Sequence, residues 1–138
     1  MKSFKVNIVT PEKVAWEADA VSVTIPGSEG YLGVWANHAP LVTGLQPGVI
    51  TIRLNDAGDE RFMACSGGFV EISENTVNIM TDSCEEADKI DSTRAQSALE
   101  RAKQRIAAAR AGEVDIDRAI LARRRAEARI EAVGKALR

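Results

Sequence analysis

The chain has 138 residues, 45% of them hydrophobic, and a formal net charge of −2 at pH 7. This length suits one ordinary domain, or one small domain with an appendage. No stretch approaches the roughly 20 apolar residues that cross a bilayer, and the opening MKSFKVNIVTP lacks the apolar core of a signal peptide. We therefore expect a cytosolic protein, or one attached to a larger assembly by protein contacts alone.

Charge and composition both change near residue 86. Residues 1–86 carry 5 basic and 12 acidic side chains, whereas residues 87–138 carry 13 basic and 8 acidic ones. All four prolines and all six aromatic residues lie in the first part, and 14 of the last 52 residues are alanine. The sequence therefore predicts an acidic N-terminal domain over 1–86 and a basic C-terminal element over 87–138. The charge split indicates either different partners for the two parts or attraction of the C-terminal element to an acidic surface.

The first part contains short stretches in which apolar and polar residues alternate. These stretches are 4–9, 20–25, 49–54, 61–65, 69–72 and 76–80. Turn residues separate them, and the glycine-rich phrases at 27–33 and 66–69 are expected to form turns and a bulge. Many short alternating strands with regular turns predict an all-β sandwich or barrel.

The second part has the periodicity of two helices. The first apolar stripe is Ala95, Ala98, Leu99, Ala102, Ile106 and Ala109, and the second is Ala119, Ala122, Ala126, Ile130, Val133 and Leu137. Asp91 or Ser92 is expected to cap the first helix and Asp115 the second, with Gly112 ending the first. Since the connection is short, the helices should form an antiparallel hairpin, which makes the chain α+β overall. Alanine stripes bury little area, so this hairpin should be mobile or need a docking surface.

Catalytic and metal chemistry have little support in the sequence. His38 is the only imidazole, and no serine or cysteine lies in a nucleophile motif. Cys65 and Cys84 are expected to be reduced, buried and inert. One histidine without a CxxC pair supplies too few ligands for a zinc site. We therefore predict no catalytic residues and no metal site.

Arginines and carboxylates on the two helices suggest a nucleotide site. Asp91 and Arg94 are three residues apart and share a helix face. Arg125 and Arg129 are four apart on the second helix. A carboxylate can accept hydrogen bonds from ribose or adenine, and a guanidinium can bind phosphate. The alternative is simple N-capping with surface ion pairs, each worth about 0–1 kcal/mol, and spacing alone favours that alternative.

A run of three arginines on the second helix, residues 123–125, could suggest nucleic acid. Consecutive residues fan around a helix, however, and the second part has no aromatic residue to stack on bases. We expect a solvated helical face and no nucleic-acid binding.

Three phrases, in this order and spacing, resemble the epsilon subunit of the F-type ATP synthase. They are VTPE at 9–12, GYLGV followed by NHAPL between 30 and 41, and SGGFVEI at 66–72. The resemblance covers essentially the whole chain. It implies a sandwich of about ten strands followed by the helical hairpin.

The resemblance also implies a function. The chain would be a non-catalytic subunit of the central stalk that couples the rotor to proton-driven ATP synthesis. Its sandwich would bind the gamma subunit and the ring of c subunits. Its hairpin, when extended, would reach the alpha and beta subunits and block ATP hydrolysis. Such a subunit lies at the cytoplasmic face of the bacterial plasma membrane, without entering the bilayer, and requires no cofactor.

Some bacterial members of this family bind regulatory ATP in the folded hairpin, through an Ile/Leu-Asp-x-x-Arg-Ala motif. The motif residues here are Ile90, Asp91, Arg94 and Ala95. The resemblance adds an acidic residue before the helix, Glu85, and two arginines of the second helix, Arg125 and Arg129. A nucleotide-sensing module outside any ATP synthase is the alternative.

Partner contacts follow from the resemblance in two places. The loop contacts with the rotor would involve Tyr31, Leu32, Gly33, Trp35 and His38. Tyr31 stands where many members carry an acidic residue facing the c ring, so this contact should be apolar or hydrogen-bonded here. Trp35 is either an interface anchor or a core residue. The inhibitory contact with the catalytic subunits would involve Arg123, Arg124 and Arg125.

Overall fold

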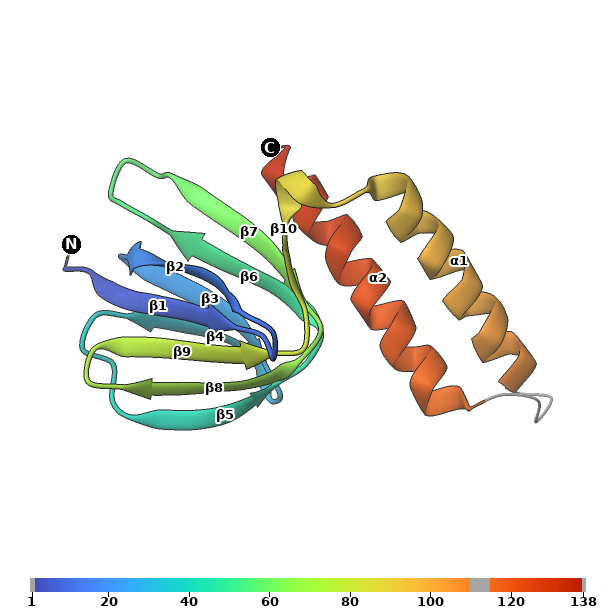
Figure 1. Ribbon diagram of the computed structural model, residues 1–138, viewed down its shortest axis with the longest axis horizontal. Helices are drawn as coiled ribbons and strands as arrows, with labels where there is room; N and C mark the ends of the chain where they lie inside the picture. The colour runs from blue at the N-terminus through green and yellow to red at the C-terminus, as the bar shows by residue number, and fades with distance from the viewer. Residues whose placement is uncertain (1, 110–114, 138) are drawn as a thin grey trace.

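The computed structural model describes residues 2–109 and 115–137. Within them, ten strands precede a short 3₁₀ helix and two α-helices (Figure 1). The strands are β1 (Phe4–Val9), β2 (Val14–Ala20), β3 (Ser22–Gly27), β4 (Gly30–Trp35), β5 (Leu41–Leu45), β6 (Gly48–Arg53), β7 (Glu60–Cys65), β8 (Gly68–Ser73), β9 (Thr76–Thr81) and β10 (Cys84–Glu86). The helices are η1 (Ala87–Lys89), α1 (Ser92–Ala109) and α2 (Ile116–Ala136). The predicted sandwich followed by a two-helix hairpin is confirmed.

The strands pair in the order β10-β7-β6-β3-β5-β8-β9-β1-β2, and β4 adds to β3. All pairs are antiparallel except β1 with β9. The alternation seen in the sequence directs one set of side chains inward, where Val6, Ile8, Ile25, Ile50 and Ile79 are fully buried. This core stabilises the sandwich by removing apolar surface from water.

Two local expectations about the strands were wrong. The alternating stretch 20–25 is divided between β2, which ends at Ala20, and β3, which begins at Ser22. The glycine-rich phrase 27–33 is mostly strand, because Gly30–Trp35 pairs with Ser22–Gly27 as a hairpin. Only residues 28 and 29 lie between the two strands, so the glycines mark a tight turn within a continuous hairpin.

Helix α2 lies between α1 and the sandwich (Figure 1). It packs on β6, β7 and η1 through a small cluster, here called the docking cluster. This cluster is Val49, Ala64, Ala87, Ala128 and Ala132, with Phe62 and Ile90 beside it. Ala119 and Ala126 are also buried, and they lie on nearly the opposite side of α2 from Ala128 and Ala132. Helix α2 therefore buries two faces, not the single one predicted.

The helix ends agree with the predicted caps where they are described. Asp91 Oδ1 accepts from the backbone N of Arg94 at 3.1 Å, and Asp115 accepts from the backbone N–H groups of Asp117 and Arg118. The predicted stop at Gly112 lies outside the described residues. Leu137 was expected in the apolar stripe, but it is 83% exposed. It lies just past the end of α2, as its C-cap residue.

Candidate functional site

A cleft of about 440 Å³ opens where β10, η1, α1 and α2 meet. It is here called the hairpin cleft. Its lining residues are Glu85, Lys89, Ile90, Asp91, Arg94, Ala95, Ala98, Arg101 and Arg129. The cleft is therefore formed jointly by the two parts of the chain, and it needs the hairpin docked on the sandwich.

Each element presents its side chains to the cleft for a simple geometric reason. Strand β10 brings Glu85 to the edge of the sheet, and the segment after η1 carries Ile90 and Asp91. On α1, Arg94, Ala98 and Arg101 follow an i, i+4, i+7 spacing and so share one face. The alanine between the two arginines leaves room that a larger side chain would fill.

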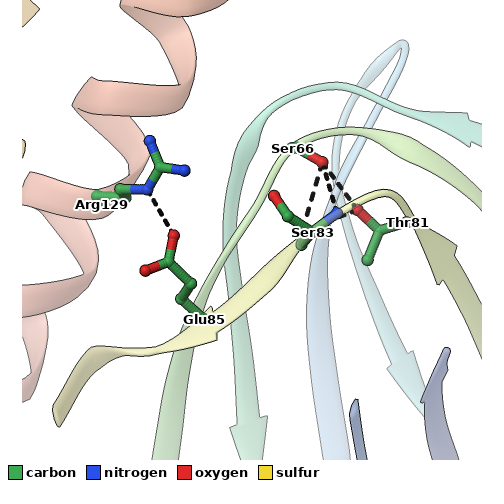
Figure 2. A network of polar contacts seen from close by, with 5 residues as sticks. All are labelled: Ser66, Thr81, Ser83, Glu85 and Arg129. Atoms are coloured by element: carbon green, nitrogen blue, oxygen red, sulfur yellow. Dashed lines mark hydrogen bonds and ion pairs between the residues drawn. The ribbon is translucent and has the colours of Figure 1, made fainter. Parts of the chain in front are cut away.

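An ion pair between Arg129 and Glu85 joins α2 to β10 across the cleft. Arg129 Nε donates to Glu85 Oε1 at 2.6 Å (Figure 2). The side chains are 29% and 39% exposed, so the pair is only partly shielded from water. A charge-assisted hydrogen bond at this distance orients both groups. It contributes modestly to stability, since solvent screens it.

Strand β10 is itself held in place by a polar network beside this pair (Figure 2). Ser66 Oγ accepts from the backbone N of Ser83 at 3.0 Å, and Thr81 Oγ1 donates to the Ser83 carbonyl at 3.1 Å. Thr81 is 4% exposed. Buried polar groups that satisfy each other rigidify their surroundings, so the network fixes the backbone two residues before Glu85.

The hairpin cleft carries an excess of positive charge. Four of its side chains are basic, Lys89, Arg94, Arg101 and Arg129, against the two carboxylates of Glu85 and Asp91. Lys89 pairs with Glu86 at 3.6 Å. In the described part of the chain, neither Arg94 nor Arg101 has an ion-pair partner. An open, basic cleft of this kind suits an anionic ligand.

The structure brings together six of the seven residues predicted for a nucleotide site. They are Glu85, Ile90, Asp91, Arg94, Ala95 and Arg129. Arg125 does not line the cleft; it lies one turn earlier on α2, beside Ser66 and Ser83. Lys89, Ala98 and Arg101 were missed. The i, i+7 spacing of Arg94 and Arg101 was the signal that could have found Arg101.

The predicted loop residues lie on and around β4. Tyr31 and Trp35 point outward and are each 54% exposed. Leu32 packs against the core, and Gly33 lies beneath the Trp35 ring, where an added Cβ would come within 3.0 Å of two ring carbons. Partly exposed His38 donates from Nδ1 to the Ala39 carbonyl at 2.6 Å. Trp35 is thus an exposed ring resting on a glycine, which fits the anchor alternative better than the core alternative.

Sequence reasoning missed a second apolar surface, on the outer face of β8, β9, β1 and β2. The strand register aligns Phe69 with Met80, Met80 with Val9, and Val9 with Val14. These four residues are here called the apolar row. Phe69 and Val14 are 49% and 56% exposed. Beside them, Pro11 and Gly68 help to line a hollow of about 320 Å³. Exposed apolar patches rimmed by polar residues are typical of docking sites.

The three arginines predicted for the inhibitory contact fan around α2. Arg123 Nε lies 3.1 Å from Glu127 Oε1, Arg124 is exposed, and Arg125 is partly buried near β7 and β10. Residues 2–109 and 115–137 contain no cluster of three metal-binding side chains. None of the helices in this range is long and apolar enough to span a membrane.

Two sequence families cover nearly the whole chain. Residues 3–87 match the family described as "ATP synthase, Delta/Epsilon chain, beta-sandwich domain". Residues 88–134 match "ATP synthase, Delta/Epsilon chain, long alpha-helix domain". The chain belongs to the ATP synthase delta/epsilon family. This membership supports its interpretation as a non-catalytic subunit.

Relatives in this family match over almost their full length. The ATP synthase epsilon chain of Moorella thermoacetica is 46% identical over 134 residues, covering 97% of this chain and 98% of the relative. That of Desulforamulus reducens is 40% identical over 131 residues, covering 95% and 97%. That of Bacillus pumilus is 39% identical over 135 residues, covering 98% and 100%.

Solved structures share the fold. A chain in the mitochondrial ATP synthase of Euglena gracilis, solved as an assembly of OSCP, F1 and c-ring, has a TM-score of 0.68 at 24% identity, covering 96% of this chain and 80% of its own. A chain in the central stalk and c-ring of the Tetrahymena thermophila mitochondrial ATP synthase has a TM-score of 0.52 at 22% identity, covering 64% and 69%.

Proposed function

We propose that the chain is a rotor subunit of a bacterial ATP synthase that restrains ATP hydrolysis through a movable hairpin. It couples the rotor to proton-driven synthesis from the central stalk, at the cytoplasmic face of the plasma membrane. The observation that carries this proposal is the combination of full-length similarity to epsilon chains with a hairpin docked on β6, β7 and η1 mainly through small side chains. Two alanines of α2 enter the docking cluster. At about 0.8 kcal/mol per buried methyl-sized group, they contribute under ~2 kcal/mol.

A hairpin docked mainly through small side chains can exchange one surface for another. In the extended state, the basic side chains Arg123, Arg124 and Arg125 would contact the alpha and beta subunits and stop hydrolysis. In the docked state, Arg123 is paired within α2 and Arg125 lies against the sandwich. Docking therefore withdraws Arg125 from an external partner, which supports inhibition that is relieved when the hairpin is docked.

Two surfaces on the sandwich suit the rotor partners. The outward residues of β4 and the loop after it, including Trp35 and His38, are the proposed contact with the c ring. The apolar row then remains for the gamma subunit, because a continuous apolar strip across four strands can bury the area that a stable subunit contact requires.

The hairpin cleft is proposed to bind ATP as a regulatory ligand. Arg94, Arg101 and Arg129 would contact the phosphates, and Asp91 would accept from the ribose or the adenine. Ile90, Ala95 and Ala98 supply an apolar wall for the base. Because the cleft exists only when the hairpin is docked, ATP would stabilise the docked state by mass action.

Calorimetry with the purified full-length chain tests the nucleotide site. Native protein should bind ATP with a measurable heat. Arg94→Ala should bind at least about tenfold more weakly, since charged hydrogen bonds contribute about 1.5–3 kcal/mol. Arg124→Ala, an arginine on the exposed side of α2, is the matched control and should bind as the native protein does. An equal affinity for the Arg94 variant and the control would remove the proposed site.

The regulatory role is tested in the assembled ATP synthase. A chain that ends at Glu86 should still assemble and should raise the rate of ATP hydrolysis. Loss of assembly would contradict the division of labour between the sandwich and the hairpin. A chain that binds ATP but never purifies with the ATP synthase would instead favour a free nucleotide sensor.

A further inference from the structure

One backbone N–H group of the sheet, that of Val49 on β6, has no carbonyl partner on the neighbouring strand β3. β3 and β6 pair at Ser22 with Arg53, Val23 with Ile52, and Thr24 with Thr51, and the pairing then stops. Continued by two residues, this register would set Pro26 opposite Val49. The Pro26 carbonyl, however, accepts from the backbone N of Gln46 at 2.9 Å. The backbone N–H of Val49 therefore has no ladder acceptor on this side.

Tyr31 supplies the missing acceptor. On β4 it pairs with Pro26, and its hydroxyl accepts from the backbone N of Val49 at 3.2 Å. Gly48 makes this possible, because an added Cβ there would lie 2.6 Å from Pro26 Cβ and 3.0 Å from the Tyr31 hydroxyl. A proline, a glycine and a tyrosine on three strands thus combine to satisfy a single N–H group.

The residue that carries this N–H group packs against the hairpin. Val49 is fully buried, and it belongs to the docking cluster with Ala128 and Ala132 of α2. The surroundings of Tyr31 agree with this position. Burial raises the pKa of its phenol, the Val49 N–H opposes that shift, and the carboxylate of Glu131 on α2 adds to it.

We propose that Tyr31 couples the outer face of β4 to the docking of the hairpin, because its hydroxyl replaces the water that α2 excludes from the Val49 N–H. When α2 leaves, water can satisfy Val49, and the hydroxyl becomes dispensable. When α2 is docked, an unpaired buried donor would oppose docking. The hydroxyl therefore stabilises the docked state more than the undocked one.

Coupling of this kind is reciprocal. A partner that draws the Tyr31 side chain away from β6 would loosen the hairpin, and release of the hairpin would free Tyr31 for a partner. This step rests on the proposed function, in which the face of β4 that carries Tyr31 contacts the rotor. The coupling between Tyr31 and the docked hairpin is a property of the chain alone.

Amide hydrogen exchange of the full-length chain tests this coupling. Tyr31→Phe keeps the ring and removes only the hydroxyl. We expect the exchange of the Ala128 and Ala132 amides to accelerate by roughly 3- to 10-fold, since most of the stability of a helix in a protein comes from tertiary packing, which α2 loses when it leaves its docking surface. This acceleration is modest for the loss of a hydrogen-bond acceptor because Tyr31 is 54% exposed, so water can partly replace its hydroxyl. The Val6 and Ile79 amides, in strands β1 and β9 outside the docking cluster, should not change.

Two further variants separate coupling from a general loss of stability. Thr24→Val also removes a hydroxyl, from neighbouring β3, and should leave exchange in α2 unchanged. Ala132→Asp places a charge in the docking cluster and should undock α2. In that background, adding Tyr31→Phe should not accelerate the exchange of α2 further. Native-like exchange in Tyr31→Phe, or an equal acceleration throughout the sandwich, would overturn the proposal. Neither outcome depends on ATP binding or on ATPase activity. The exchange experiment therefore tests the coupling independently of the proposed function.

Discussion

Arg129 on α2 and Glu85 on β10 are joined by a 2.6 Å hydrogen bond between Nε and Oε1. The pair connects the sandwich to the hairpin at the hairpin cleft. It also sets up a competition, because a phosphate group that enters the cleft must share or replace Glu85 as the partner of Arg129. The pair therefore stabilises the docked hairpin when no ligand is bound, and it is also part of the proposed ATP site.

Glu85→Gln should slightly weaken the docking of the hairpin on the sandwich. Removing one charge of a partly exposed pair should cost about 0.5–1 kcal/mol of docking free energy. Exchange of the α2 amides should then rise a few-fold, and added salt should reduce the difference between the variant and the native chain. Glu86→Gln, whose parent side chain forms its ion pair with Lys89, is the control. Identical exchange in the two variants would mean that the ion pair does not hold the hairpin.

Arg101→Ala should weaken ATP binding about as much as Arg94→Ala. Both arginines lie on the same face of α1 and lack an ion-pair partner among the described residues, so a phosphate would meet no internal competitor there. Calorimetry against Lys103→Ala, on the same helix but outside the cleft, checks the assignment. An Arg101 variant with native affinity would restrict the phosphate contacts to Arg94 and Arg129.

The helix packing depends on fully buried alanines. Ala126 is 0% exposed, so Ala126→Leu should force α1 and α2 apart at a cost of about 1–3 kcal/mol. Thermal melts followed by helical circular dichroism should show an earlier loss of helix. Ala136→Leu makes the same chemical change at an exposed position of α2 and should leave the melt unchanged. Equal melts for both variants would show that the helix interface is not tightly packed.

Cys84 should make stability depend on alkaline pH. Burial raises the pKa of its thiol to about 12, from an ordinary value near 9, with smaller contributions from Cys65, Glu86 and Glu85. Above pH 9 the unfolded chain loses this proton while the folded chain keeps it. The contribution is therefore complete below pH 9 and declines up to about pH 12, by at most about 1.4 kcal/mol per pH unit.

Denaturant titrations across this range, compared with Cys84→Ala, isolate that contribution from other groups that titrate. The native chain should lose stability faster than the variant between pH 9 and 11. Parallel losses in both proteins would mean that the Cys84 thiol ionises as readily when folded as when unfolded.

The division of the chain and the class of each part could be predicted from the sequence, because periodicity and composition change together near residue 86. Asp91 and Arg94 could also be grouped from the sequence, since they are three residues apart at the start of one helix, whereas Ile90 and Ala95 were implied only by the family resemblance. The strand Gly30–Trp35 was not, because its glycines suggest turns and only the pairing with β3 makes them strand. Helical periodicity assigned one apolar face to α2 and missed Ala128 and Ala132, because alanine is compatible with either a buried or an exposed face.

Long-range relationships are the part that sequence reasoning could not supply. The apolar row depends on the register of four strands, one pair of which is parallel. The contact between Tyr31 and Val49 depends on where β3 and β6 stop pairing. Arg125 was grouped with Arg129 by helical spacing, but the tilt of α2 against β7 and β10 directs it to the neighbouring serines instead.

The most direct test of the central claim is the rate of ATP hydrolysis by the assembled ATP synthase at one fixed ATP concentration. Three forms of this chain are compared: native, Arg94→Ala, and a chain that ends at Glu86. If ATP holds the hairpin docked and the free hairpin is the brake, Arg94→Ala should hydrolyse more slowly than native, and the shortened chain should hydrolyse fastest. An Arg94→Ala rate equal to native, or a shortened chain no faster than native, would contradict the account.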